Sequence, residues 1–277
     1  MTAPAATPDL EAVKAKQQQT WASGDYHEVA ATIPIISELL ADAADLRAGS
    51  RVLDVAGGSG NTALAAARCG AEVVSLDYVP SLLERSQERA KAEGLSYETI
   101  EGDAEAMPFD DASFDAVISC VGVMFAPDHQ RAASELLRVC KPGGTIALAS
   151  WCPDSFIGEL FRTTAKHVPQ PAGLQPPGLW GTEDRVRSLF GDGVSEVRAR
   201  RRTYNFRYRS PRHFVDTFRT YYGPTHKAFA ALDEAGQWAL ADDLAGLMAR
   251  SNKYREEGDE PVAIPSDYLE VVATRAG

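Results

Sequence analysis

The sequence predicts an α/β protein built on a doubly wound, mostly parallel sheet, with a helical cap over one edge of the sheet. Two observations support this fold class. Between residues 50 and 151, short apolar runs alternate with helical stretches, and strands this apolar are typical of a parallel sheet covered on both faces. Residues 152–181 then contain five prolines, so we expect a lid or cap there in place of another regular strand and helix.

Five strands are expected in the first part of the chain. Each is a run of four to seven mostly apolar residues, and the runs lie at 52–55, 72–77, 97–101, 114–120 and 145–150. Helices are expected before the strands, at 9–21 and 32–47, and between them. The helix after the first strand is expected to end at residue 69, and the next two lie at 80–93 and 129–140. Thr32 is the expected cap of the second helix and Pro34 suits its first turn, while the Lys-Pro-Gly-Gly sequence at 141–144 is expected to break the last one.

Beyond the proline-rich segment, the expected elements are longer and less regular. They are a short helix at 182–190, a β-like stretch at 194–208, a helix from 211 that Ser210 caps, further helix from 224 to 251 with a break near Gly236, and a final strand at 268–274. Residues 1–8 are expected to be disordered, and residues 256–260 are expected to form an acidic loop.

The composition disfavours several classes of function. The 277 residues carry a net charge of −11, and a surface this acidic repels nucleic-acid backbones. No run of 18 apolar residues predicts a membrane span, and the first residues lack the pattern of a secretory signal. The four cysteines show no Cys-x-x-Cys spacing, so we expect reduced thiols, no metal site and a cytoplasmic location. The oligomeric state stays open.

A glycine turn follows the first strand. Gly57, Gly58 and Gly60 leave no β-carbons where the chain turns into the next helix, so a ligand can lie against bare backbone. The turn also directs the first amide groups of that helix toward such a ligand. This pattern predicts a small cofactor with charged or polar parts, and the alternative is a tight turn without a ligand.

An acidic residue ends the second strand, 19 residues after Gly58. The Asp77 carboxylate can accept hydrogen bonds from both vicinal hydroxyls of a ribose. Together with the loose G-x-G-x-x-A pattern from Gly58 to Ala63, it fits a dinucleotide-binding fold as well. At this point an NAD-type dinucleotide-dependent oxidoreductase stays a possible interpretation.

Five motifs in order extend the comparison. They are Val-Leu-Asp-Val-Ala-Gly-Gly-Ser-Gly at 52–60, Leu-Asp-Tyr at 76–78, Glu-Gly-Asp-Ala-Glu-Ala-Met-Pro-Phe at 101–109, Ser-Phe-Asp-Ala-Val-Ile-Ser at 113–119, and Glu-Leu-Leu-Arg-Val-Cys-Lys-Pro-Gly-Gly at 135–144. In these motifs the chain resembles the class I S-adenosylmethionine-dependent methyltransferases, and more narrowly the ubiquinone/menaquinone C-methyltransferase type. The resemblance is strong over residues 50–151 and weak over the final strand. Ala56 departs from it, standing where many members have the first glycine of the loop.

The resemblance implies a Rossmann-like methyltransferase fold with seven strands, of which the last is antiparallel. Residues 1–277 would then form a single domain, with N-terminal helices at 1–48, a cofactor-binding core at 50–151, a cap and substrate region with the sixth strand at 152–260, and the last strand at 264–277. The implied activity is methyl transfer from S-adenosylmethionine to carbon or oxygen of a small organic acceptor. A protein that binds S-adenosylmethionine without catalysis is the other alternative.

The family pattern also implies roles for nine residues. Ala56, Gly58 and Gly60 would line the methionine part of the cofactor, and Asp54 would order that loop and the cofactor's amino group. The remaining roles belong to residues at the ends of the later strands. Asp77 would bind the ribose, and Ser119 would face the sulfonium region. The adenine would contact Tyr78, Asp103 and Ala104.

The chemistry itself needs little from the protein. Transfer of a methyl group from a sulfonium is a direct displacement that requires an aligned nucleophile and sometimes one base. The catalytic residue is therefore unassigned, with His129, just beyond the fourth strand, as a candidate, and Asp128, His213 and His226 as other possible bases. The acceptor is expected to contact three residues of the N-terminal and cap segments, Tyr26, His213 and Tyr222.

Two further features bear on the acceptor. The arginines between 198 and 212 are either charges on a solvated strand or a site for a carboxylate or phosphate of the substrate. The residues after the fourth strand, Ser-Cys-Val-Gly from Ser119, differ from the Asn/Asp-Pro-Pro-aromatic motif of enzymes that methylate nucleobase amino groups. Methylation of DNA adenine is therefore disfavoured.

Overall fold

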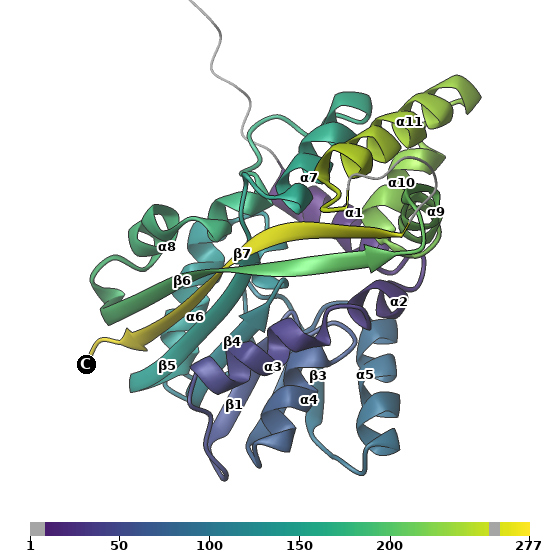
Figure 1. The fold of residues 1–277 in the computed structure, drawn as a ribbon. Helices are drawn as coiled ribbons and strands as arrows, with labels where there is room; N and C mark the ends of the chain where they lie inside the picture. Colours follow the sequence, from purple (N-terminus) through teal and green to yellow (C-terminus); the bar gives the residue numbers. More distant parts are fainter. Residues whose placement is uncertain (1–8, 255–260) are drawn as a thin grey trace, which may run out of the picture.

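Seven strands form one sheet within residues 9–254 and 261–277, the part of the chain that this computed structural model describes (Figure 1). The strands are β1 Arg51–Val55, β2 Glu72–Asp77, β3 Glu98–Glu101, β4 Phe114–Cys120, β5 Cys140–Trp151, β6 Val194–Tyr208 and β7 Val262–Arg275. Their order is β3-β2-β1-β4-β5-β7-β6. The first five pair in parallel, and β7 runs antiparallel to both β5 and β6. The predicted fold class is confirmed.

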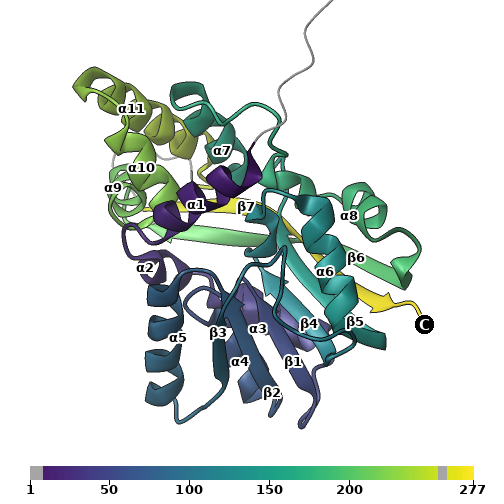
Figure 2. The same ribbon diagram turned by 180° about the vertical axis from the view of Figure 1, so that it is seen from behind.

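Helices cover both faces of the sheet and one of its ends. They are α1 Leu10–Trp21, α2 Tyr26–Ala30, α3 Pro34–Ala43, α4 Asn61–Arg68, α5 Pro80–Ala92, α6 His129–Val139, α7 Phe156–His167, α8 Glu183–Phe190, α9 Pro211–Tyr221, α10 Gly223–Ala230 and α11 Glu234–Ser251. Helices α3 and α4 pack together on one face, and α6 and α8 on the other (Figures 1 and 2). The later helices α7, α9, α10 and α11 gather with α1 beyond one end of the central strands.

The strand order places a cleft at a defined position. From β1 the chain moves outward to β2 and β3, and it then returns to the other side of β1 to form β4. In sheets of this kind, ligands bind outside the carboxyl ends of the two strands at which the order reverses. A ligand site is therefore expected at the carboxyl ends of β1 and β4.

Several predicted bounds need correction. The second helix, expected over 32–47, is the shorter α3, which Ile33 and not Thr32 precedes as the cap residue. A separate short helix that was not predicted, α2, lies before it and is capped by Asp25. The proline-rich segment 152–181 contains a regular helix, α7, because Ser155 caps it and its prolines lie outside it. The break expected near Gly236 lies slightly earlier, at 231–233 between α10 and α11, and Gly236 itself lies in the first turn of α11.

The last parallel strand also begins earlier than predicted. The Lys-Pro-Gly-Gly sequence ends α6 and then lies inside β5, where the pairing with β4 shifts its register between Phe114 and Ala116. The final strand β7 is also longer than predicted, because it pairs with β6 from Val262 onward. The expectations for residues 1–8 and 256–260 lie outside the described residues. Where the chain is described, no helix has both the length and the apolar character that crossing a membrane requires.

Candidate cofactor-binding site

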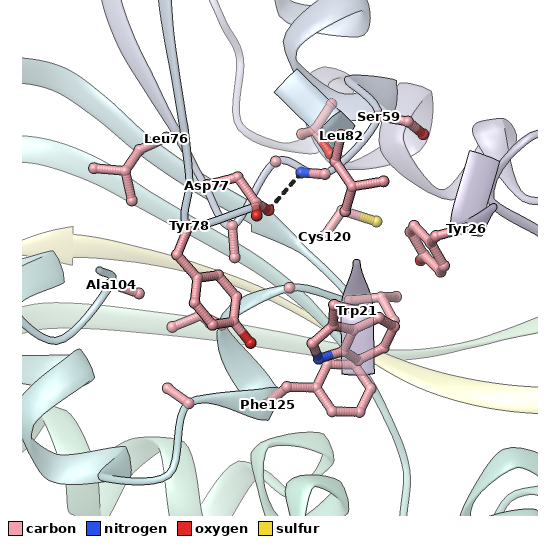
Figure 3. Close-up of a pocket in the computed structure, with 18 of the residues that line it drawn as sticks. Trp21, Tyr26, Ser59, Leu76, Asp77, Tyr78, Leu82, Ala104, Cys120 and Phe125 are labelled. Carbon is pink, nitrogen blue, oxygen red and sulfur yellow. Dashed lines mark hydrogen bonds between the residues drawn. The ribbon is translucent and has the colours of Figure 1, made fainter. Parts of the chain in front are cut away.

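A cavity with about 930 Å³ of empty space, its open mouth included, lies at the carboxyl ends of β1, β2 and β4. Figure 3 shows Asp77 pointing into it, with Tyr78 and Ala104 on one side and Trp21, Tyr26 and Cys120 on the other. Its remaining wall comes from α1, from the glycine turn after β1, and from residues 121–127 after β4. This is the cleft that the reversal of strand order predicts.

The glycine turn forms the floor of the cavity. Gly58 has a φ of +54°, and a β-carbon there would meet only the ring of Tyr26, at 3.6 Å, so its backbone faces the open space. Ala56 and Val121 also have positive φ values, +53° and +54°, although both carry side chains. Such backbone is costly for residues other than glycine and gathers at functional sites. Both strained residues line the cavity, directly after β1 and β4.

Asp77 ties the glycine turn to β2. Its Oδ2 accepts a hydrogen bond from the amide of Gly58 and its Oδ1 accepts one from the amide of Val79, both at 2.9 Å (Figure 3). Burial raises the pKa of Asp77 to about 6, although those amide bonds oppose the shift. Each oxygen keeps a second lone pair, so the carboxylate can still accept bonds from a ligand's hydroxyl groups.

Asp54 lies beneath the turn without a partner. It is fully buried, and within the described residues neither carboxylate oxygen has a hydrogen bond of good geometry. Burial raises its pKa to about 7. A buried carboxyl group without a partner is costly, and at functional sites such a group commonly awaits a cation or a hydrogen-bond donor.

Helix α1 closes the side of the cavity that Tyr78 and Asp103 line. Lys14 Nζ bonds Asp103 Oδ2 at 2.9 Å and lies 3.1 Å from the buried Glu105, and Gln18 Nε2 donates to the carbonyl of Tyr78 at 2.5 Å. Burial alone would lower the pKa of Lys14, but its bonds to these acids outweigh burial and raise the pKa. No local pattern predicts this contact, since Lys14 and Asp103 are 89 residues apart.

The structure brings most of the predicted cofactor residues together. Six of them line the cavity: Ala56, Gly58, Asp77, Tyr78, Asp103 and Ala104. Gly60 lies behind the turn, where a β-carbon would meet the hydroxyls of Ser86 and Tyr97. Ser119 is buried, donates to the carbonyl of Val55 at 2.6 Å and accepts from the amide of Val123 at 2.9 Å, so it supports the wall without facing the cavity.

The predicted bases lie elsewhere. His129 is the first residue of α6, and Asp128 accepts from the amide of Arg131 as the cap of that helix. The His129 ring is buried against Trp180, with ring centroids 5.7 Å apart, and burial lowers its pKa to about 4. His213 and His226 lie on the cap, and neither lines a cavity found in the described residues.

The predicted acceptor residues divide between two cavities. Tyr26 lines the cofactor cavity and also a second, smaller cavity, whereas Tyr222 lines only the second. None of the arginines between 198 and 212 lines either one. Arg201 pairs with Asp267 at 2.7 Å and Arg202 with the buried Glu270 at 2.6 Å, which favours the structural interpretation of this stretch.

The features of this cavity fit S-adenosylmethionine. The open backbone at Gly58 leaves room for its amino-acid part, the buried Asp54 carboxyl group behind the turn favours the positive ammonium of that part, and Asp77 can accept from the ribose hydroxyls. Among the described residues, no arginine lines the cavity, and the lysine that does, Lys14, is held by Asp103 and Glu105, so the cavity has no free cationic side chain for a pyrophosphate.

We expect replacement of Gly57 by alanine to destabilise the turn. A β-carbon there would collide with Ser75 Oγ and lie 2.6 Å from Asp54 Oδ2. Overpacking of this kind costs about 1–3 kcal/mol of unfolding free energy, which urea denaturation can measure. The matched control is Gly246→Ala in α11, where the nearest atom is a flexible arginine end at 3.4 Å and the protein should be unchanged or more stable. Equal stability of the Gly57 variant and wild type would contradict this packing.

Replacement of Lys14 by alanine should loosen α1. Glu105, which is 3% exposed, would lose its cation and keep only the amide of Asp128 as a side-chain partner. We expect a loss of about 1–3 kcal/mol in unfolding free energy, because a buried charged group loses a hydrogen-bond partner. Lys16→Ala, at an exposed position of the same helix, is the control. If both variants unfold at the same urea concentration, the Lys14 contact is not stabilising.

Comparisons with known proteins agree on one family. The family model described as "Methyltransferase domain" matches residues 53–148. The chain is 43% identical over 251 residues to an uncharacterized protein of Mycobacterium tuberculosis, covering 90% of this chain and 91% of that protein. It is 36% identical over 159 residues to the demethylmenaquinone methyltransferase of Thermus thermophilus, covering 52% of this chain and 72% of that enzyme. The YcgJ protein of Bacillus subtilis shares the fold, with a TM-score of 0.60 at 17% identity over 88% of this chain and 99% of that one.

The fold, the cavity and the relatives therefore lead to the same conclusion. The resemblance seen in the five motifs is confirmed, and a dinucleotide-dependent oxidoreductase is set aside. The chain belongs to the class I S-adenosylmethionine-dependent methyltransferases, and it is an enzyme whose cofactor is S-adenosylmethionine.

Proposed function

We propose that this enzyme transfers the methyl group of S-adenosylmethionine to a carbon or oxygen atom of a small organic acceptor. The observation that carries this proposal is the cavity wall after β4. There Cys120, Val121 and Gly122 line the cavity, and their side chains carry no amide or carboxylate group that could hold an amino group for methylation. The acidic net charge of −11 supports a small acceptor over a nucleic acid.

The cofactor is held by the nine residues that the motifs identified, in two groups. Ala56, Gly58, Asp77, Tyr78, Asp103 and Ala104 contact it directly. Asp54, Gly60 and Ser119 act from behind the turn, where their burial and contacts support the cavity wall. The whole chain acts as a single domain, since one hydrophobic cluster runs through the sheet and the cap.

The protein's contribution to the reaction is alignment and exclusion of water. The bound cofactor supplies a methyl group on a positively charged sulfur, which is a good leaving group. Among the described residues, no histidine lines either cavity, and burial raises the pKa of Cys120 to about 12, so that thiol stays protonated. Helix α1 and Trp21 keep solvent from the site, and the chain holds the acceptor in line with the methyl group.

The proposed location is the cytoplasm. All four cysteines are free, and Cys140 and Cys152 are buried as thiols, which is the usual state in a reducing compartment. Fractionation of cells that produce the tagged protein would test this, and recovery from an oxidising compartment would contradict it.

The activity is tested with S-adenosylmethionine that carries a labelled methyl group. The protein is incubated with it and a library of small phenols, enols, thiols, amines and carboxylic acids, and products are identified by mass spectrometry. We expect label on carbon or oxygen, and much less of it with Asp77→Ala when the cofactor is not saturating. Label only on nitrogen or sulfur would overturn the proposed atom type. Tight binding of S-adenosylhomocysteine with no labelled product from any acceptor would favour a binding protein without catalysis.

A further inference from the structure

A second, smaller cavity, with about 370 Å³ of empty space when its open mouth is included, adjoins the cofactor cavity. The two share Tyr26, Ile33, Val121 and Phe125, so these side chains lie at the boundary between them. The rest of its wall comes from the cap and the adjacent strands: from α7, from the inner ends of β5 and β6, and from α9 and Tyr222 just after it. We call this space the cap chamber.

The lining of the cap chamber is entirely uncharged. Among the described residues, twelve side chains line it, none carries a charge, and seven are aromatic. Trp151, Phe206 and Phe218 are each at most 3% exposed, so the surroundings are dry. An ion placed there would lose its hydration without gaining a partner, which is strongly unfavourable. A planar apolar group would instead contact ring faces and edges on several sides.

Two tyrosines, Tyr26 and Tyr222, bring phenol hydroxyl groups to the lining of the cap chamber. The rings of Tyr26 and Tyr222 lie 6.3 Å apart, and Trp21 packs edge-on against both. Burial raises the pKa of each tyrosine, so both hydroxyls stay protonated and act as hydrogen-bond donors or acceptors without charge. They suit an uncharged polar atom on an otherwise apolar ligand.

We propose that the cap chamber is the acceptor subsite and that it selects an uncharged, apolar, ring-sized acceptor over one with a carboxylate or phosphate. This inference rests on the proposed function, since it identifies the acceptor by its position beside the cofactor cavity. Tyr26 stands at the boundary, because its ring covers Gly58 on one side and borders the cap chamber on the other. An acceptor held in the cap chamber thus reaches the cofactor cavity beside the glycine turn.

The test is a binding measurement on the full chain saturated with S-adenosylhomocysteine. Isothermal titration calorimetry compares indole, which is neutral, with indole-3-carboxylate, which has the same rings and a negative charge. We expect indole to bind at least about tenfold more tightly, because the carboxylate would be buried without a partner. Equal binding of the two, tighter binding of the carboxylate, or no binding of indole would overturn the inference. Failure of the protein to bind S-adenosylhomocysteine would overturn the proposed function, and the inference with it.

A variant with an added positive charge in the cap chamber should gain affinity for the carboxylate probe. Phe161 is a partly buried residue of α7 that lines the cap chamber, with its ring centroid 5.9 Å from that of Phe125. In Phe161→Arg the carboxylate probe should bind at least about tenfold more tightly than in wild type. S-adenosylhomocysteine affinity shows whether the variant is folded. Trp238→Arg, at a residue of α11 that is 64% exposed, is the matched control and should leave both probes unchanged. A folded Phe161 variant without this gain would contradict the proposed position of the acceptor, and the wild-type comparison holds independently of any variant.

Discussion

Replacement of Asp77 by alanine is expected to weaken S-adenosylhomocysteine binding by about 1–3 kcal/mol, which is roughly 5- to 150-fold in Kd. The carboxylate accepts the amides of Gly58 and Val79 and faces the cavity, so its removal loosens the turn and also takes away the acceptor for the ribose hydroxyls. Asp77→Asn should fall between wild type and alanine, because an amide group keeps one acceptor oxygen but has no charge.

The neighbouring strand provides a control for Asp77. Glu101 is likewise the acidic last residue of its strand, β3, but it is exposed and does not line the cavity. Glu101→Ala should therefore bind S-adenosylhomocysteine as wild type does, by calorimetry at the same pH. Unchanged affinity in Asp77→Ala would show that the ribose is held by other residues.

A fall in pH should also release the cofactor. Before binding, Asp77 holds its proton up to a pH of about 6 and Asp54 up to about 7, because both are buried. If binding requires the ionised forms, affinity falls as pH drops through these values. Between pH 7.5 and 5, Asp77 alone should weaken S-adenosylhomocysteine binding about tenfold, and Asp54 should add up to roughly a hundredfold.

Titration calorimetry across this range measures the effect, together with the protons released into buffers of different ionisation enthalpy. Asp54→Asn should remove the part of the pH dependence that is centred near 7 and leave the part near 6. Affinity that stays constant from pH 7.5 to 5 would show that neither carboxyl group ionises on binding.

For the protein without cofactor, the carboxyl groups of Asp54 and Asp77 predict a pH dependence of stability that runs in the opposite direction. A carboxyl group whose pKa is raised by folding binds more protons in the folded state than in the unfolded state between about pH 4 and its folded pKa. The unfolding free energy of the cofactor-free protein should therefore fall as pH rises from about 4 to 7, as far as Asp54 and Asp77 determine it. Binding of S-adenosylhomocysteine at neutral pH should offset this loss.

The core of the fold was predictable because its signals are local. Strands β1, β2 and β4 are mostly apolar runs, and their predicted bounds agree with the structure within one residue. Asp77 was identifiable for the same reason, since it ends such a run at a fixed distance after Gly58. Helix α7 had a local signal too, in the capping residue Ser155, but the prolines on both sides obscured it.

Contacts between distant segments could not be predicted in this way. Nothing near Lys14 indicates that it lies over Asp103, and nothing near Phe206 or Phe161 indicates that they share a cavity with Tyr26. His129 shows the same limit. It follows β4 closely in sequence, but Asp128 begins α6 there and the ring packs against Trp180 instead of the cavity. Proximity along the chain to a strand end did not decide which way that side chain points.

Strand β6 forms an edge of the sheet at which two molecules could pair. It is the outermost strand at one end of the sheet and is 15 residues long, so its outer edge presents a long row of backbone groups. Exposed arginines at 198, 200, 201 and 207 lie along it. If two molecules joined edge to edge there, like charges would face each other across the new ladder. The exposed arginines of β6 therefore disfavour the pairing of two sheets through this edge.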